Sequence, residues 1–408
     1  MMHFDLIVIG MGLSGLMAAK TAVDMGKRVL IIGKGMGTLV MLSHTIDLLG
    51  TLPLPARVKE VLPQWIDDHP EHPYAKAGFE RIDDALSSFN AFFQPPYSFQ
   101  ARDERNSLVP TGAGTLRPTY LLPSTMMKGV AIQGKKTLIV GFDGFKDFYA
   151  RRVADSLKCR AVTLSLPDRV QGEWTATSLA RSMEQAPFRE AVAAEIKNHL
   201  EDESLVGFPA VLGLNDPVGA RKDLEKRTGA AVFEIPVLPP SIPGLRVFNR
   251  FKARLLQKGA TFLLGHSVSN VILIGKRCDG LEVFRSPVTD SYSADRYLLA
   301  TGRFVGGGLQ ADRERIIEPL FGIPVTQPAG RRDWFQRAFF SDQGHPVHRS
   351  GIVVDSSFRP VDIQGNPLFE NVWAAGTILA HHHCIEEKSR EGIEISTGYA
   401  ATKKAFEE

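Results

Sequence analysis

The sequence predicts an α/β protein in which both ends of the chain build one discontinuous domain and the middle builds an inserted α/β domain. A strand, a glycine turn and a helix at 4–26 predict the start of the discontinuous domain. Two later apolar segments end in small residues, which predicts that the chain comes back to this domain there; they are 296–302 and 371–376. Between these parts strand-like and helix-like segments alternate, which is typical of an α/β domain.

The N-terminal segment has the order strand, turn, helix, strand. Phe4–Ile9 is a short apolar run rich in β-branched residues, typical of a buried parallel strand. Helix-forming residues follow at 16–22, and Gly26 suits the end of a helix. A second apolar run at 28–32 predicts the next strand. These elements together have the length of one βαβ unit.

The remaining elements are predicted from shorter patterns. Seven prolines between residues 53 and 96 interrupt the chain around one amphipathic helix at 81–93. The expected strands are 136–141, 161–166, 210–214, 231–236, 261–264, 268–274 and 281–284. The expected helices are 146–158, 192–200, 216–229, 246–258 and 392–406. The expected domain bounds are 1–50 and 246–408 for the discontinuous domain and 51–245 for the insertion.

The composition is that of a soluble globular protein. Of the 408 residues, 44% are hydrophobic and 23% are charged, which excludes disordered and fibrous chains. The 48 Lys and Arg nearly balance the 45 Asp and Glu, so nothing indicates nucleic-acid binding. Three isolated cysteines, Cys159, Cys278 and Cys384, cannot form a disulfide framework or ligate an iron–sulfur cluster. We expect a cytoplasmic protein without a membrane span.

Gly10, Gly12 and Gly15 form a G-x-G-x-x-G motif between the first strand and the first helix. Gly10 allows a tight turn, and Gly12 lets the backbone approach a pyrophosphate. Gly15 lets the helix pack close to the strand, while the helix N-terminus supplies N–H donors. The motif predicts a Rossmann-type dinucleotide site; a glycine turn without a ligand is the alternative. The predicted site also includes Met11, Leu13 and Ser14.

The end of the second strand departs from the usual dinucleotide pattern. Rossmann proteins commonly place Asp or Glu there to hold the adenosine ribose. Here Gly33 occupies this position, and the next carboxylate is Asp47. We expect backbone groups or Lys34 to hold the ribose. For Lys34 a solvated surface charge is the alternative.

The turns at Thr301-Gly302 and Gly376 favour a flavin over a nicotinamide cofactor. In a nicotinamide dehydrogenase we would expect the dinucleotide-binding domain to be continuous in sequence. Here the turn at residue 10 and these late segments are expected to form one site. Flavoproteins of the glutathione-reductase and fumarate-reductase type combine an N-terminal glycine motif, a late A-T-G turn and a C-terminal N-[LV]-[FWY]-A-x-G segment. The sequence resembles them, which implies a discontinuous Rossmann-type FAD-binding domain with an inserted α/β domain.

Several longer segments resemble one family in particular. They are 43–49, 72–74, 115–119, 238–246 and 302–309. Together they are similar to the B subunit of anaerobic glycerol-3-phosphate dehydrogenase, from residue 1 to about 405. The resemblance implies a flavin subunit with FAD, or FMN as the alternative, beside an FAD-bearing catalytic A subunit and an iron–sulfur C subunit. It also implies attachment to the inner membrane only through a partner.

Further cofactor contacts follow from this resemblance. We expect them at Ser43, Val268, Gly392 and Ile393. The charged segment at 387–391 replaces a glycine-rich loop that such flavoproteins usually have before the last helix. Arg390 or Lys388 near the flavin could stabilise an anionic reduced flavin, and a solvated charged loop is the alternative.

The catalytic candidates are histidines and the substrate-phosphate candidates are arginines. His44 and His383 could accept a proton, since a general base must reach the substrate hydroxyl. Arg117 and Arg303 could bind a phosphate, because a guanidinium fork matches phosphate oxygens. We expect no metal site, because the adjacent histidines 381–383 cannot easily converge on one ion.

These observations predict a flavin subunit that helps oxidise sn-glycerol 3-phosphate to dihydroxyacetone phosphate and passes electrons towards a quinone pool. One alternative is a self-sufficient soluble FAD-dependent oxidoreductase of the fumarate-reductase type. Another is a non-catalytic scaffold that has lost its ligand. The segment 331–337, which mixes arginines with Trp334 and Phe335, is the expected docking surface for a partner.

Overall fold

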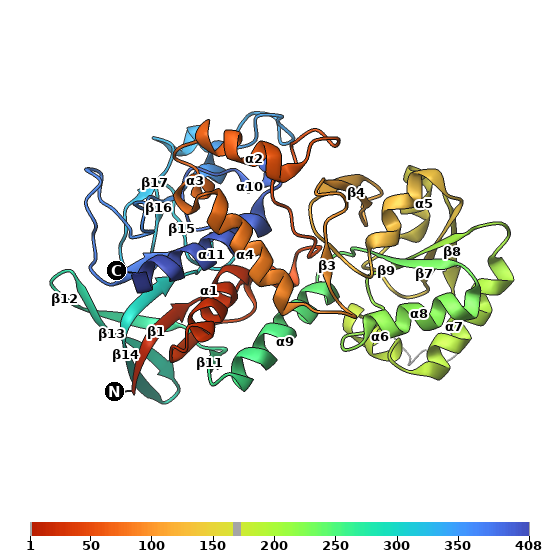
Figure 1. Ribbon diagram of the computed structural model, residues 1–408, viewed down its shortest axis with the longest axis horizontal. Helices are drawn as coiled ribbons and strands as arrows, with labels where there is room; N and C mark the ends of the chain where they lie inside the picture. The colour runs from red at the N-terminus through yellow and green to blue at the C-terminus, as the bar shows by residue number, and fades with distance from the viewer. Residues whose placement is uncertain (1, 166–172, 408) are drawn as a thin grey trace.

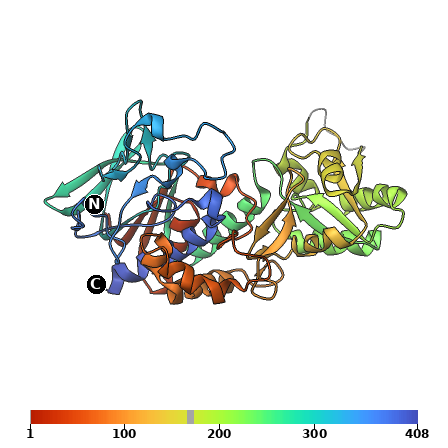
Figure 2. The ribbon, with the colours of Figure 1, turned by 90° about the horizontal axis from the view of Figure 1, so that it is seen from above.

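Two units lie side by side along the long axis of the molecule (Figures 1 and 2). The computed structural model describes residues 2–165 and 173–407. One unit contains both chain ends, and the other is built from the middle of the chain (Figure 1). The α/β fold with a discontinuous first unit is therefore as predicted.

The first unit is built on a seven-stranded sheet. Its strand order is β11-β2-β1-β14-β13-β12, and β19 pairs with β14. The strands β11, β2, β1, β14 and β19 are parallel, whereas β12, β13 and β14 form an antiparallel meander. The strand bounds are Met2–Ile9 (β1), Val29–Gly33 (β2), Thr261–Leu264 (β11), Val268–Ile274 (β12), Arg277–Arg285 (β13), Val288–Leu299 (β14) and Val372–Ala374 (β19).

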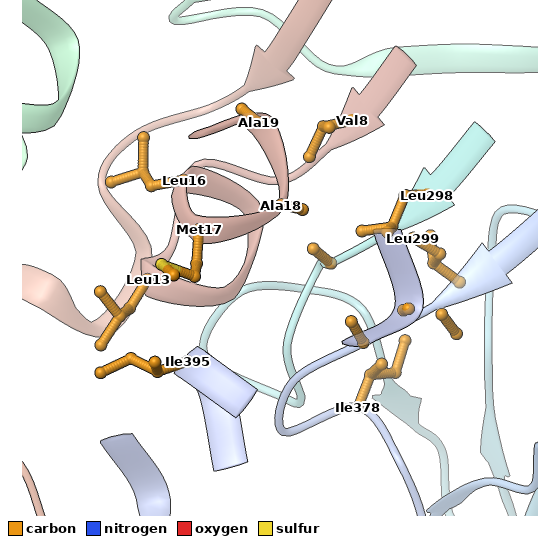
Figure 3. Close-up of a cluster of buried hydrophobic side chains, with 14 of the residues drawn as sticks. Val8, Leu13, Leu16, Met17, Ala18, Ala19, Leu298, Leu299, Ile378 and Ile395 are labelled. Carbon is orange, nitrogen blue, oxygen red and sulfur yellow. The ribbon is translucent and has the colours of Figure 1, made fainter. Parts of the chain in front are cut away.

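Helices from distant parts of the chain cover this sheet. The first helix, α1 (Leu13–Asp24), packs against the last, α11 (Arg390–Glu407), and α11 packs against α4 (Phe79–Phe92) and α3 (Pro73–Ala77). Figure 3 shows Leu13 and Met17 of α1 beside Ile395 of α11, all in one buried cluster. Because α1 and α11 share a core, the first and last segments of the chain fold together. Two further helices belong here, α2 (Val58–Asp67) and α9 (Ile242–Gln257).

The core of the first unit continues into the segment that the predicted bounds gave to the insertion. Val58, Phe89 and Phe99 belong to the same buried cluster as β1 and α11. The predicted bounds stay a prediction, and the same buried cluster reaches residues 120–121. The amphipathic helix predicted at 81–93 is α4, and its apolar side packs into this core.

The second unit is a four-stranded parallel sheet with its own core. The strand order is β10-β9-β7-β8, and a separate buried cluster fills the space between sheet and helices. The strands are Thr137–Phe142 (β7), Arg160–Leu164 (β8), Leu205–Pro209 (β9) and Ala231–Ile235 (β10). The helices are Ala150–Leu157 (α5), Ala176–Ser182 (α6), Ala186–His199 (α7) and Pro217–Thr228 (α8). Residue 166, the predicted end of the second strand here, lies outside the described residues.

One strand prediction is wrong. The predicted strand 210–214 is an irregular segment that follows β9, although residues 210–212 are fully buried. The amide of Leu212 donates to the Glu234 carboxylate at 2.9 Å, and Gly213 has a positive φ of +109°. The amide of Ala210 still donates to the carbonyl oxygen of Ile235 in β10, but from Leu212 on a side chain replaces the neighbouring strand as the partner.

The remaining elements are short. The strands are Phe99–Gln100 (β3), Ser107–Pro110 (β4), Leu116–Thr119 (β5), Leu122–Pro123 (β6), Gln310–Ala311 (β15), Ile316–Ile317 (β16), Val325–Thr326 (β17) and Gly351–Ile352 (β18). The 3-10 helices are Gly37–Val40, Met127–Gly134, Arg331–Asp333 and Pro346–Arg349, and a four-residue helix, α10, spans Cys384–Glu387.

Candidate cofactor and active site

A cavity of about 690 Å³ lies at the carboxyl ends of the parallel strands of the first unit. The strands β1, β2, β14 and β19 each end at its wall, and the start of α11 closes one side. Ligands of open parallel sheets bind at this edge, outside the carboxyl ends of the strands. The predicted site residues that line the cavity are Gly10, Met11, Gly12, Ser14, Gly33, Lys34, Val268, Thr301, Gly302, Arg303 and Gly376.

The glycine turn has the geometry that a dinucleotide site needs. Gly10 has φ +122°, and a Cβ there would overlap the backbone of Ala300 on the neighbouring strand. A Cβ on Gly15 would overlap the carbonyl group of Gly10, so this glycine sets how closely α1 approaches β1. Gly12 differs, because a Cβ at this position would meet no protein atom within 4 Å. Gly12 therefore leaves open space beside the start of a helix, where a pyrophosphate fits.

Two hydroxyl groups at this turn are buried and have no partner. Ser14 Oγ and Thr301 Oγ1 make no hydrogen bond to any other described residue, and both side chains line the cavity. Gly376 has φ +86°, and a Cβ on it would lie 2.8 Å from Ser14 Cβ. Unpaired buried hydroxyl groups are costly, so these two are suited to hydrogen bonding with a bound cofactor.

The end of β2 approaches the glycine turn without a carboxylate. A Cβ on Gly33 would lie 2.8 Å from Met11 Cγ, so a larger residue here would displace the turn. Lys34 lines the cavity directly after Gly33, and Val268 lines it from β12. That backbone groups or Lys34 hold an adenosine ribose stays a prediction, and the polar residues 266, 267 and 269 line the same cavity.

Other predicted cofactor contacts lie outside the cavity wall. Leu13 and Ile393 are buried in the core between α1 and α11. Gly392 packs against Asp47, and a Cβ on it would overlap the Tyr74 hydroxyl group. Gly15 and Ser43 likewise do not line the cavity. Of these residues, Leu13, Gly15, Gly392 and Ile393 shape the site through packing.

His44 does not reach the cavity. Its side chain is 1% exposed, and Nε2 contacts the carbonyl oxygen of Leu39. Burial lowers the pKa of His44 to about 4, so the ring is neutral at physiological pH. A Cβ on Gly244 would lie 2.5 Å from Nε2, which shows how tightly the ring is enclosed.

His383 lies behind the cavity wall as the cap of α10. Its Nδ1 accepts a hydrogen bond from the amide of Glu386 at 3.2 Å, and burial lowers its pKa. Its ring lies 5.0 Å from the ring of His348, and it is His348 that lines the cavity. Burial lowers the pKa of His348 to about 4. The structure thus places His348, which sequence reasoning missed, where His383 was expected.

The two phosphate candidates already have partners. Arg303 lines the cavity, but its terminal nitrogens contact the carbonyl oxygens of His348 and Leu379 and the ring of His382, which lies 3.0 Å from Nη2. Burial lowers the pKa of Arg303 to about 10. Arg117 lies outside the cavity wall and is paired with the buried carboxylate of Asp47. Arg303 is therefore held in place by protein groups at the cavity, and Arg117 lies away from it.

The segment from α10 to the start of α11 brings three groups to the cavity whose placement the sequence left open or missed. Cys384, Arg390 and Glu394 all line it. Burial raises the pKa of Glu394 to about 7, although the positive charge of Arg390 opposes this shift. The signal in the sequence was the four-residue spacing of Arg390 and Glu394, which puts both on one face of a helix.

The comparisons with known proteins agree with this geometry. The profile of the FAD binding domain family matches residues 5–392. The chain belongs to this family. The B subunit of a probable anaerobic glycerol-3-phosphate dehydrogenase from Halobacterium salinarum is 33% identical, over 99% of this chain and 98% of the relative. The B subunit of the Vibrio vulnificus enzyme is 28% identical, over 100% and 97%. The resemblance to the B-subunit family is thereby confirmed.

A similar solved structure is the 3-ketosteroid delta1-dehydrogenase of Sterolibacterium denitrificans in complex with 1,4-androstadiene-3,17-dione. It is 10% identical, covers 100% of both chains and has a TM-score of 0.49. The family match shows that the protein is an FAD-dependent oxidoreductase with FAD as its cofactor, as predicted, and gives no support to FMN. The open space at Gly12 and the unpaired hydroxyl groups of Ser14 and Thr301 fit this cofactor.

Proposed function

We propose that the protein is the flavin subunit of a membrane-associated glycerol-3-phosphate dehydrogenase. In this role it helps oxidise sn-glycerol 3-phosphate to dihydroxyacetone phosphate and passes electrons towards a quinone pool. The observation that carries the proposal is similarity along almost the whole chain to relatives named as the B subunit of this enzyme. The cavity for FAD supports it, because the oxidation of a secondary alcohol needs an acceptor for a hydride.

The residues of this chain hold the cofactor and control its surroundings. Gly12 admits the pyrophosphate, and the first turn of α1 supplies N–H donors towards it. Ser14 and Thr301 offer hydroxyl groups to the same region. FAD, when bound, supplies the acceptor for two electrons and a hydrogen. Arg390 places a positive charge on the cavity wall, which would favour a reduced, negatively charged flavin.

Partners complete the proposed electron route. No helix in the described part of the chain is long and apolar enough to cross a membrane. An iron–sulfur cluster normally takes four cysteines, and the whole sequence has three. We therefore propose an FAD-bearing catalytic subunit and an iron–sulfur subunit as partners, with the iron–sulfur subunit linking the assembly to the inner face of the membrane.

We propose a docking surface that differs in detail from the predicted segment 331–337. Trp334 is 2% exposed and lies under the guanidinium of Arg331, at 4.9 Å, so it is a core residue. The aromatic side chains that do face solvent are Phe335, Phe339 and Phe340, and Phe340 is 92% exposed. Exposed aromatic residues of this kind anchor protein interfaces, so we propose 335–340 as part of the surface that binds a partner.

Co-expression tests the proposal. The chain is expressed with a catalytic and an iron–sulfur subunit from the same organism and purified through a tag on this chain, and flavin and iron are then measured. We expect both further subunits, FAD and iron to co-purify, and the complex to reduce a quinone analogue with glycerol 3-phosphate. Full activity of this chain alone would contradict the proposal and favour a self-sufficient FAD-dependent oxidoreductase.

A further inference from the structure

Glu394 is a buried carboxyl group on the wall of the flavin cavity. It lies in the first turns of α11, and its side chain is 6% exposed. Within the described part of the chain its oxygens make no hydrogen bond, unlike those of Glu318 on the same cavity wall, which accept from three backbone amides. A carboxyl group with no protein partner that borders a cofactor cavity is free to change its protonation state.

The charged groups around Glu394 come from three directions. Arg390, one turn earlier on α11, is the charged group that acts on it most directly. Cys384 of α10 lines the same cavity, and Arg303 borders the cavity from the segment after β14. Glu391 is the neighbouring carboxyl group on α11.

Glu391 points away from the cavity and gives a matched comparison. It does not line the wall, and its Oε2 is buried without a partner among the described residues. Burial and the nearby Asp47 raise the pKa of Glu391 to about 8. Asp47 in turn is paired with Arg117, the charge that opposes this repulsion. The two glutamates therefore share a helix and deep burial but differ in access to the cofactor.

We propose that Glu394 takes up one proton from solvent when FAD bound in the cavity is reduced by two electrons, and releases it on reoxidation. The electrons enter the flavin, an O–H bond forms on the Glu394 carboxylate, and no other bond of the protein changes. The reason is electrostatic: negative charge added to the cofactor favours the neutral form of a nearby carboxyl group. A pKa of about 7 leaves Glu394 largely ionised just above neutral pH, so it can respond there.

The inference rests on the FAD site of the proposed function and not on the identity of the substrate. The test is therefore a redox titration of the FAD-loaded protein with dithionite, with the midpoint potential measured between pH 6 and 9. Each proton taken up with two electrons adds about 30 mV per pH unit to the slope. We expect the wild-type slope above pH 7 to be steeper than that of Glu394→Gln by about this amount.

The control is Glu391→Gln, the same substitution on the same helix away from the cavity. It should keep the steep slope of the wild type. Equal slopes in the wild type and Glu394→Gln, or loss of the steep slope only in Glu391→Gln, would overturn the inference. Because dithionite supplies the electrons, the redox titration tests the inference even if glycerol 3-phosphate is not a substrate.

Infrared difference spectroscopy provides a second readout if Glu394→Gln does not bind FAD. Reduction of the wild-type protein above pH 7 should produce a carbonyl band of a newly protonated carboxylic acid, which shifts in D₂O. Where the variant does bind FAD, the band should be missing from its spectrum. Absence of such a band in the wild type would refute proton uptake by a buried carboxylate.

Discussion

The carbonyl group of Gly10 occupies the space that a Cβ atom on Gly15 would need. This contact joins the residue that directly follows β1 to the first turn of α1, whose N-terminus lies at the cavity. Gly12, between these two, has extended backbone (φ −71°, ψ 177°) that any residue adopts, and open space in front of it. The three glycines of one motif therefore have different roles.

Gly12→Val should give a folded but colourless protein. The valine side chain would meet no protein atom, yet it would fill the place of the pyrophosphate. Released flavin, measured by absorbance near 450 nm, is expected to fall at least tenfold at an unchanged melting temperature of the flavin-free protein. The control is Gly134→Val, because Gly134 is equally open but lies outside the cavity. Full flavin occupancy in Gly12→Val would contradict the placement of FAD.

Glu394→Gln should stabilise the flavin-free protein at alkaline pH. The folded-state pKa of Glu394 is raised from 4.5 to about 7, so its contribution to stability is fully present below pH 4.5 and is lost as the pH rises through 7. Glutamine removes this loss. The free energy of unfolding should match the wild type near pH 4.5 and exceed it by roughly 3 kcal/mol at pH 8.5. Urea unfolding at both pH values measures this, and a constant difference between them would argue against a buried titrating group.

Arg246→Met should make the protein easier to unfold. Arg246 donates to both carboxylate oxygens of Glu234, at 2.7 and 2.8 Å, and both side chains are almost fully buried. Removing one partner leaves a buried charge, which typically costs roughly 3–5 kcal/mol. The double variant with Glu234→Leu should recover much of this loss in denaturant unfolding. An Arg246→Met protein of wild-type stability would show that the pair is not a structural one.

The isolated FAD-loaded protein should oxidise glycerol 3-phosphate slowly or not at all. His44 is enclosed away from the cavity, Arg303 is held by carbonyl groups, and Arg117 lies outside the cavity wall, so these three predicted residues are not placed to bind or deprotonate a substrate there. Anaerobic mixing with glycerol 3-phosphate should leave the flavin absorbance nearly unchanged over minutes. Rapid bleaching of the lone chain would show that substrate is oxidised at this subunit.

The parts of the fold that sequence alone predicted are those with strong local patterns. The βαβ start was recognisable because Phe4–Ile9 and the glycine motif carry their own signals. The strand predicted at 210–214 was wrong. The segment has the apolar composition of a strand, but the amide of Leu212 donates to the Glu234 side chain and not to a neighbouring strand. Burial produced by tertiary packing has no local signature.

The candidate site shows the same division. Gly12, Ser14, Thr301 and Gly376 could be predicted, since a short motif places each of them at a strand end. Glu394 could not, because a glutamate near the start of a helix is normally a solvated residue, and only the packing of α11 onto the cavity buries it. His44 was misplaced for the opposite reason: a histidine after a Rossmann strand looks functional until its ring is seen to contact Leu39.

The most direct test of the central claim is electron transfer through this subunit in its complex. Reduction of a quinone analogue by glycerol 3-phosphate is measured for the reconstituted complex containing either the wild-type chain or Gly12→Val. We expect the variant complex to assemble with its partners, to lack this subunit's FAD and to reduce quinone at least tenfold more slowly. An assembled variant complex that reduces quinone at the wild-type rate would contradict electron transfer through this FAD.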